Sequence, residues 1–195
     1  RESGIADSNI LSAIEKIPRE KFIPDNFRNQ SYDNIALPIG DSQTISQPFV
    51  VAKMTQLLEL LPKHKILEIG TGSGYQSAVL SKLVRRVYTI ERIKNLLVKA
   101  EKVFKELKIS NIVTKYADGN HGWKEQIPFD RIIITAATPL ISKEIESQIV
   151  EGGIIVAPMV EKNKQVIVKY KKIENKLESE IFDDVLFVPN LSGIE

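Results

Sequence analysis

The sequence of 195 residues contains no cysteine and only two histidines. Without cysteine the chain has no disulfide, no thiolate metal ligand and no thiol nucleophile. A metal site built from histidines is not expected with so few of them, so we predict that the protein uses no metal. No apolar run reaches the ~18–20 residues that a membrane-spanning helix needs. Any chemistry of this chain therefore has to come from other side chains.

A strong excess of one charge is also missing, because 27 Lys and Arg residues face 25 Asp and Glu residues, for a net charge of +2. The basic residues occur in short pieces, so no long basic run predicts nucleic-acid binding. The chain opens on Arg1 without a signal-peptide pattern, and its first polar residues resemble the tail of a helix whose natural start is missing. We predict a soluble, cytoplasmic, monomeric protein that binds neither nucleic acid nor membranes.

Helical and strand spacing alternate along most of the chain. Helices are predicted near residues 8–17, 46–61, 74–84, 94–108 and 142–150, and strands near 65–69, 87–91, 112–116, 131–135 and 153–157. This alternation predicts an α/β fold with a doubly wound, mostly parallel sheet. In the tail, two segments alternate by twos around a polar turn near 174–176. They predict an antiparallel addition at the edge of the sheet.

The segment 18–46 is rich in Pro, Asn and Asp but contains isolated apolar residues. We predict a long, ordered loop with a short strand at Ile35–Leu37, because structureless connections of this length are usually functional. Ser46 is then expected as the N-cap of the helix that follows, with Pro48 in its first turn. His64 and His121 are expected to be structural or exposed rather than catalytic.

The stretch "HKILEIGTGSGYQSAVL", residues 64–80, places three glycines between a strand and a helix. A phosphate-binding Walker loop needs a Lys after the glycines, which is absent, and a dinucleotide fingerprint fits poorly. The pattern is better described as an acid followed by alternating glycines, namely Glu68, Gly70, Gly72 and Gly74. A carboxylate at the end of the strand would repel a pyrophosphate and attract an ammonium or a sulfonium. S-adenosylmethionine carries both cations, so this loop favours it over NAD.

Two further acids end the next two predicted strands. Glu91 lies 21 residues after Gly70, where an acid accepts hydrogen bonds from ribose hydroxyls, as it also would in NAD proteins. Asp118 follows the third strand, where its carboxylate would reach an adenine amino group. An NAD-binding oxidoreductase and a non-catalytic nucleotide-binding module remain open at this point, although the chain lacks the Tyr-x-x-x-Lys pair of short-chain reductases.

The group that accepts the methyl is expected to need little chemical activation. The stretch "TAATP", residues 135–139, follows the fourth strand, where amine methyltransferases commonly carry an acidic or amide motif. It contains no acid. A carboxylate is already ionised at pH 7 and is therefore a suitable acceptor.

The stretches "ALPIG", "QTISQP", "LEIGTGSGYQ", "ERI", "DGNHGW", "PFDRIIITAA", "EGGIIVAP" and "FVP" occur in this order along the chain. Together they resemble the protein-L-isoaspartate O-methyltransferases over nearly the whole length, from Gly4 to Gly193. The sequence departs mildly from the family pattern at Thr138 and Asn190, which concerns local packing. The family resemblance implies methyl transfer from S-adenosylmethionine to the free α-carboxylate of an isoaspartyl residue in a damaged protein, and the ester then collapses to a succinimide.

The resemblance also implies roles for individual residues. Ser46 would be the active-site serine, and Ile45 and Val188 would line the peptide site with it. The residues expected to bind the cofactor are Thr44, Ile45, Glu68, Gly70, Thr71, Gly72, Ser73, Gly74, Glu91, Asp118, Gly119 and Ala136. No general base is needed, because charge is neutralised as an anionic oxygen attacks a cationic methyl donor, and alignment supplies the rate.

We therefore expect one methyltransferase domain over residues 1–195. Residues 1–62 would form the N-terminal helices and substrate loop, 63–160 the cofactor-binding core, and 161–195 the C-terminal strands. A methyltransferase acting on another carboxylate is the nearest alternative.

Overall fold

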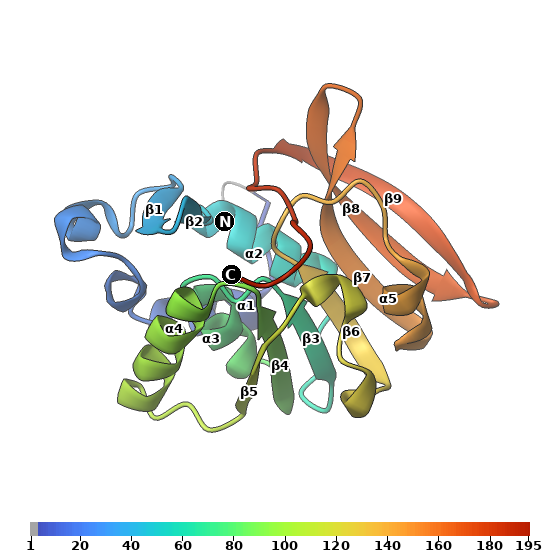
Figure 1. Ribbon diagram of the computed structural model, residues 1–195, viewed down its shortest axis with the longest axis horizontal. Helices are drawn as coiled ribbons and strands as arrows, with labels where there is room; N and C mark the ends of the chain where they lie inside the picture. The colour runs from blue at the N-terminus through green and yellow to red at the C-terminus, as the bar shows by residue number, and fades with distance from the viewer. Residues whose placement is uncertain (1–3) are drawn as a thin grey trace.

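The computed structural model describes residues 4–195, in which seven strands form one sheet with helices on both faces (Figure 1). The helix tail expected for the first residues falls at 1–3, outside the described residues. The strands of the sheet are β3 (Lys65–Ile69), β4 (Arg86–Glu91), β5 (Ile112–Tyr116), β6 (Phe129–Ile134), β7 (Ile149–Glu161), β8 (Lys164–Ile173) and β9 (Lys176–Val185). The helices are α1 (Ser8–Lys16), α2 (Pro48–Leu57), α3 (Tyr75–Ser81), α4 (Lys94–Glu106) and α5 (Lys143–Ser147).

The strand order is β5-β4-β3-β6-β7-β8-β9. The strands β3 to β7 pair in parallel, and β8 and β9 add antiparallel at one edge. The doubly wound sheet with an antiparallel addition is thus confirmed. The chain moves outward from β3 to β5 and then returns to place β6 on the other side of β3. Ligands of open α/β sheets bind at the carboxyl ends of the strands beside such a reversal.

The strands alternate between two apolar layers. Ile66 and Ile133 pack against α2 and α3 on one face, and Leu67 and Ile132 pack toward α5 on the other. Each of these four side chains has an exposed fraction of 0%. Since successive side chains of a strand point to opposite faces, Glu68 lies on the face of Ile66, toward α3.

The segment 18–46, predicted as a loop, contains regular structure. Two 3-10 helices, η1 (Arg19–Phe22) and η2 (Asp25–Gln30), precede a hairpin of β1 (Leu37–Gly40) and β2 (Gln43–Ile45). The strand expected at Ile35–Leu37 begins only at Leu37. Asp41 and Ser42 form the turn with φ values of +51° and +55°, the left-handed conformation that a two-residue hairpin loop requires. Neither residue is glycine, so the local sequence does not predict this turn.

Ser46 is not the N-cap of α2, so that prediction is wrong. The cap position is Gln47, which has an extended backbone and makes no side-chain capping bond. Its carbonyl accepts a hydrogen bond from Val51 N, which starts the helix one residue later than expected. The helix also ends at Leu57 rather than near 61, because Glu59 adopts a left-handed φ of +50°.

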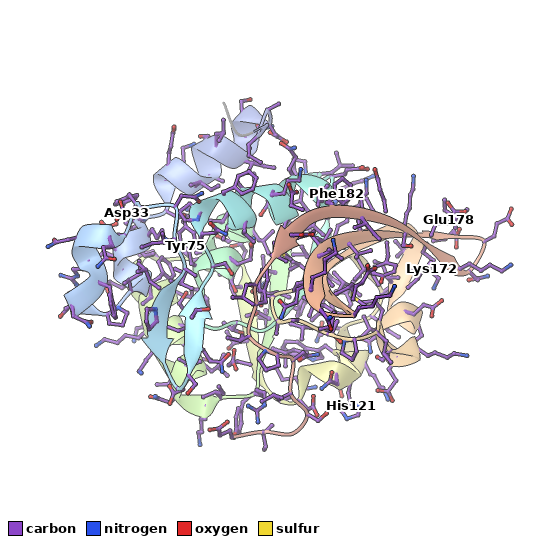
Figure 2. All side chains as sticks on the ribbon, turned by 90° about the horizontal axis from the view of Figure 1, so that it is seen from above. Asp33, Tyr75, His121, Lys172, Glu178 and Phe182 are labelled. Carbon is purple, nitrogen blue, oxygen red and sulfur yellow. The ribbon has the colours of Figure 1, made fainter. Side chains whose placement is uncertain are left out.

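After α2, the structure differs from the prediction mainly in element lengths. Helices α3 and α5 are shorter than expected, and β7 runs from Ile149 to Glu161 rather than over 153–157. The predicted turn after β8 is confirmed, with Glu174 and Asn175 between β8 and β9. Figure 2 shows Glu178 at the far end of this hairpin, on the side of the molecule opposite Asp33. The tail beyond β9 returns to the centre and ends beside α4 (Figure 1).

Candidate active site

A cavity lies at the carboxyl ends of β3, β4 and β6, where the strand order reverses. Its wall combines the glycine loop after β3, the β1–β2 hairpin, the first turns of α2 and the C-terminal tail. The predicted site residues that line it are Thr44, Ile45, Ser46, Gly70, Thr71, Gly72, Ser73, Glu91, Gly119, Ala136 and Val188. Segments far apart in the sequence thus meet around one cavity.

The amides of the glycine loop are largely used inside the protein. Gly70 N and Thr71 N both donate to Ile90 O, and Gly74 N donates to Thr71 O. Gly72 N donates to Glu91 Oε2 at 2.8 Å. A loop that cradles a pyrophosphate needs free amides, so these bonds favour a ligand without phosphate.

The glycines of the loop are needed for different reasons. Gly70 has a φ of +97°, and an added Cβ would lie 2.5 Å from Thr135 Oγ1. Gly74 has a φ of +89°, and its Cβ would lie 2.6 Å from the Phe104 ring of α4. Gly74, which is expected from the sequence to contact the cofactor, does not line the cavity, and it permits close packing of α3 on α4.

Glu91 is held in the cavity wall by two backbone amides. Its Oε2 accepts from Gly72 N, and its Oε1 accepts from Ile93 N at 2.9 Å. Among the described residues that line the cavity, Glu91 alone carries a carboxylate. Each of its oxygens retains a further acceptor position, so the fixed carboxylate can receive hydroxyl donors such as those of a ribose.

Glu68, which is expected from the sequence to contact the cofactor, does not line the cavity. It is fully buried on the α3 face of β3, where Ser77 Oγ donates to its Oε2, and its Oε1 has no partner among the described residues. Burial raises the pKa of Glu68 to about 8, helped by the nearby negative charge of Glu91 and opposed by the Ser77 hydroxyl. A carboxyl group in this position links β3 to α3 through Ser77.

Asp118 also lies outside the cavity lining, although Gly119 beside it belongs to that lining. Its Oδ1 accepts from Asn120 N at 2.9 Å, and its Oδ2 accepts from Gly193 N of the tail at 2.7 Å. Burial alone would raise the pKa of Asp118, but these hydrogen bonds bring it below its usual value. In the structure, Asp118 fastens the tail through Gly193.

Ser46 lies at the end of the β1–β2 hairpin, and its hydroxyl makes no hydrogen bond with any residue between 4 and 195. Its carbonyl accepts from Arg19 Nη1 at 2.9 Å. A smaller hollow adjoins the cavity and shares Thr44, Ser46 and Val188 with it. A free hydroxyl at the junction of two hollows is well placed to orient an acceptor.

Much of the lining was not anticipated from the sequence. The additional residues are mainly apolar and come from α2, the start of α3 and the tail: Val50, Val51, Met54, Tyr75, Gln76, Phe187, Pro189, Asn190 and Leu191. Their spacing is that of ordinary buried residues, so no signal separates them from the core. For the tail, the family resemblance pointed to Val188 alone.

Both histidines lie away from the cavity lining. His64 is buried and accepts from Leu61 N through Nδ1, and His121 is exposed and pairs with Glu144. Between residues 4 and 195, no group of three His, Asp or Glu side chains is arranged to hold a metal ion. In the same range, no helix has the length and apolar character needed to cross a membrane.

The sequence model of the family described as Protein-L-isoaspartate(D-aspartate) O-methyltransferase (PCMT) matches residues 1–195. A protein-L-isoaspartate O-methyltransferase of Maricaulis maris is 48% identical over 193 residues, which cover 99% of this chain and 91% of that protein. One of Aliivibrio fischeri is also 48% identical, over 99% of this chain and 92% of that protein.

Solved structures agree with this similarity. One described as a protein-L-isoaspartate O-methyltransferase has a TM-score of 0.90 and 26% identity, covering 99% of this chain and 64% of that longer chain, which is less than two thirds of its length. Another, described as a beta-aspartate methyltransferase (PCMT) from Plasmodium falciparum in complex with S-adenosyl-L-homocysteine, has a TM-score of 0.86 over 97% of this chain and 94% of that one. At 23% identity the second likeness concerns the fold alone.

Proposed function

The chain belongs to the protein-L-isoaspartate O-methyltransferase family and methylates isoaspartyl residues of damaged proteins with S-adenosylmethionine as methyl donor; on this premise we propose which residues carry the reaction. The observation that carries the proposal is one cavity with two functional walls. Glu91 is fixed by amides on one wall, and the free hydroxyl of Ser46 stands on another. The oxidoreductase alternative loses its support with the family assignment.

On the cofactor side, the groups that line the cavity fit S-adenosylmethionine. Glu91 would accept the ribose hydroxyls, and the loop from Gly70 to Ser73 would lie against the methionine end with its own amides largely satisfied. Thr44, Ile45, Gly119 and Ala136 would complete the contacts. Glu68 and Gly74 would act indirectly, through the position of the loop. When bound, the cofactor supplies an electrophilic methyl group on a sulfonium.

On the acceptor side, Ser46 would donate a hydrogen bond to the α-carboxylate of the isoaspartyl residue, and Ile45 and Val188 would contact the peptide. The carboxylate is ionised at pH 7 and needs no base. The protein therefore has to align it and exclude water, which the apolar wall of α2 and the tail favours.

The test is labelled-methyl transfer to paired peptides that differ only in Asp versus isoAsp linkage. We expect label in the isoaspartyl peptide alone. Equal labelling of both peptides, or labelling of an unrelated carboxylate only, would contradict the proposed acceptor. As an independent test of the cofactor, S-adenosylhomocysteine should raise the melting temperature and NADH should not.

We also propose that the three parts of the chain act as one domain, and that the enzyme works in the cytoplasm as a monomer without nucleic-acid or membrane partners. The scattered basic residues and the net charge of +2 support the absence of a nucleic-acid partner. Light scattering on the purified protein tests the monomer, and cell fractionation tests the location.

A further inference from the structure

Arg19 of η1 is buried, with an exposed fraction of 1%, although no sequence motif marks it. Its guanidinium donates to three backbone carbonyls from separate segments. Nε donates to Ser31 O at 2.7 Å, Nη1 to Ser46 O at 2.9 Å and Nη2 to Ile35 O at 3.4 Å. One side chain thus holds η2, the start of the hairpin and the residue at its end.

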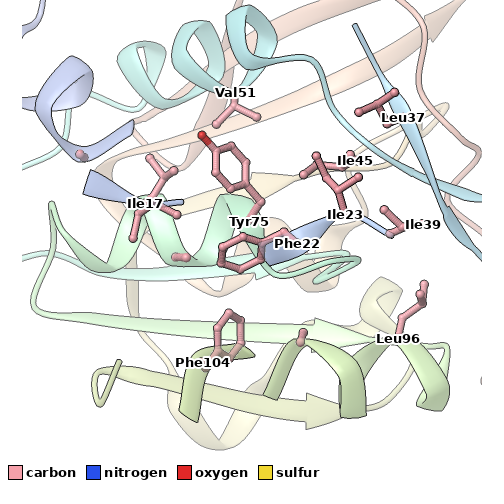
Figure 3. Packing of buried hydrophobic residues seen from close by; sticks show 14 of the residues in the cluster. Ile17, Phe22, Ile23, Leu37, Ile39, Ile45, Val51, Tyr75, Leu96 and Phe104 are labelled. Carbon is pink, nitrogen blue, oxygen red and sulfur yellow. The ribbon is translucent and has the colours of Figure 1, made fainter. Parts of the chain in front are cut away.

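The same guanidinium contacts the cofactor side of the cavity through Tyr75. Arg19 Cζ lies 5.1 Å from the centre of the Tyr75 ring, and Tyr75 follows Gly74 directly at the start of α3. Figure 3 shows the Tyr75 ring between Phe22 and Val51, in the cluster that also contains Ile45 of the hairpin. Arg19 therefore packs between the glycine loop and the substrate hairpin.

The charge of Arg19 is not balanced by an acid. Between residues 4 and 195, its polar partners are carbonyl oxygens, and no carboxylate lies within ion-pairing distance of it. Burial lowers the pKa of Arg19, but a guanidinium titrates so far above neutrality that it stays charged. A buried charge without a counterion is costly, so its position directly behind Ser46 calls for a function.

We propose that Arg19 is a positioning residue for the acceptor: it holds Ser46 in register with the glycine loop, and its unpaired charge favours an anionic carboxylate beside Ser46. This inference rests on the proposed function, since the carboxylate is the isoaspartyl acceptor. The effect of the charge and the effect of the hydrogen bonds should appear in different measurements. The acceptor loses its charge as the methyl ester forms, so the charge of Arg19 favours peptide binding, whereas its fork of hydrogen bonds favours alignment and turnover.

The experiment compares two peptides that differ only in the α-group of the isoaspartyl residue, one with the carboxylate and one with the neutral carboxamide. Their Kd values are measured by calorimetry with S-adenosylhomocysteine bound. Arg19→Gln should raise the Kd of the carboxylate peptide by about 5-fold or more and leave the Kd of the carboxamide peptide nearly unchanged. Arg19→Lys keeps the charge but loses the fork, so it should retain the preference for carboxylate and lower kcat more than it raises KM. Arg28→Gln, at an exposed arginine paired with Asp25, is the matched control and should change neither Kd.

An equal loss for both peptides, or a parallel loss of S-adenosylhomocysteine affinity, would mean that Arg19 only holds the fold together. If Arg19→Gln does not fold, Arg19→Lys decides, because the absence of a carboxylate preference in that variant overturns the charge effect. The proposed function is judged separately on the wild type. A wild-type enzyme that does not distinguish isoAsp from Asp peptides refutes the function. A wild-type enzyme that does distinguish them, together with unchanged Kd values in Arg19→Gln, refutes this inference alone.

Discussion

The two halves of the cavity are built in different ways. The cofactor half comes from consecutive strands and turns. The Glu91 carboxylate accepts one hydrogen bond from Gly72 N, after the neighbouring strand, and one from Ile93 N, in the turn after its own strand. The acceptor half joins the hairpin that ends at Ser46 with a tail that starts 140 residues later, near Leu186. It depends on long-range bonds, such as Ala137 N to Val188 O and Arg19 Nη1 to Ser46 O.

Substitutions in the two halves should therefore affect different properties of the enzyme. A change in the cofactor half disturbs a packed sheet and should act on stability or on cofactor affinity. A change in the acceptor half at a polar cavity residue such as Ser46 should act on turnover with the fold intact, whereas Ile45 of the same half also belongs to the core. A residue of one half whose substitution had the effect expected of the other half would contradict this division.

The largest effect is expected for Gly74→Ala. The new Cβ would meet the Phe104 ring at 2.6 Å in a left-handed backbone, so we expect a loss of ~2–4 kcal/mol in the free energy of unfolding. Denaturant titration measures it. Gly72→Ala is the control, because its Cβ would have its nearest neighbour at 3.6 Å. Gly72→Ala should lower stability less and weaken cofactor binding instead. Equal destabilisation by Gly72→Ala and Gly74→Ala would contradict the division of roles among the glycines.

A comparable effect, dependent on pH, is expected at Glu68, whose pKa burial raises from 4.5 to about 8. Between these values the native state holds a proton that the unfolded state has lost, so stability falls as pH rises through this window. From pH 5 to pH 7 the loss from this group is roughly 2–3 kcal/mol. Unfolding free energies of wild type and Glu68→Gln, measured across this range, should therefore diverge in slope. Parallel curves would show that Glu68 is ionised in the native protein.

Glu91→Ala should reduce cofactor affinity while the fold survives. A charge-assisted hydrogen bond to a ribose hydroxyl is worth ~1.5–3 kcal/mol, which corresponds to a 10- to 150-fold rise in Kd per bond. Calorimetry with S-adenosylhomocysteine measures this, and adenine alone is the matched ligand without ribose. A similar loss for both ligands would mean that Glu91 serves only to hold Gly72.

The smallest effect is expected for Ser46→Ala, which tests the acceptor half. Loss of its hydroxyl should lower kcat/KM about 10-fold and leave the melting temperature unchanged, because Ser46 caps no helix. Ser142 is the matched serine, since its Oγ does accept the capping bond from Ile145 N at 3.2 Å. Ser142→Ala should lose ~0.5–2 kcal/mol of stability with normal turnover. Wild-type turnover in Ser46→Ala would leave its hydroxyl without a role.

The alternation of helical and strand periods was enough to predict the parallel sheet and the hairpin at its edge, since both periods are local properties of the chain. Local patterns were less reliable where a turn uses unusual residues. Asp41 and Ser42 form a left-handed turn without glycine, so the β1–β2 hairpin was predicted as a loop. At Ser46, a serine before a proline matched a cap, but the backbone of Gln47 takes that position.

By itself, the sequence determined the fold class and pointed to the glycine loop and Glu91, because a strand and a tight turn depend on residues close together in the chain. Ser46 was indicated by the family resemblance, since the local pattern predicted only a helix cap that the structure places at Gln47. Tertiary structure alone decided which of the marked residues face the cavity. Glu68 and Gly74 belong to the same motif as Gly72, yet strand alternation turns one toward α3 and helix packing turns the other toward α4. It also brought the tail over the cavity and Arg19 behind Ser46, through contacts whose partners lie far apart in sequence and leave no local pattern.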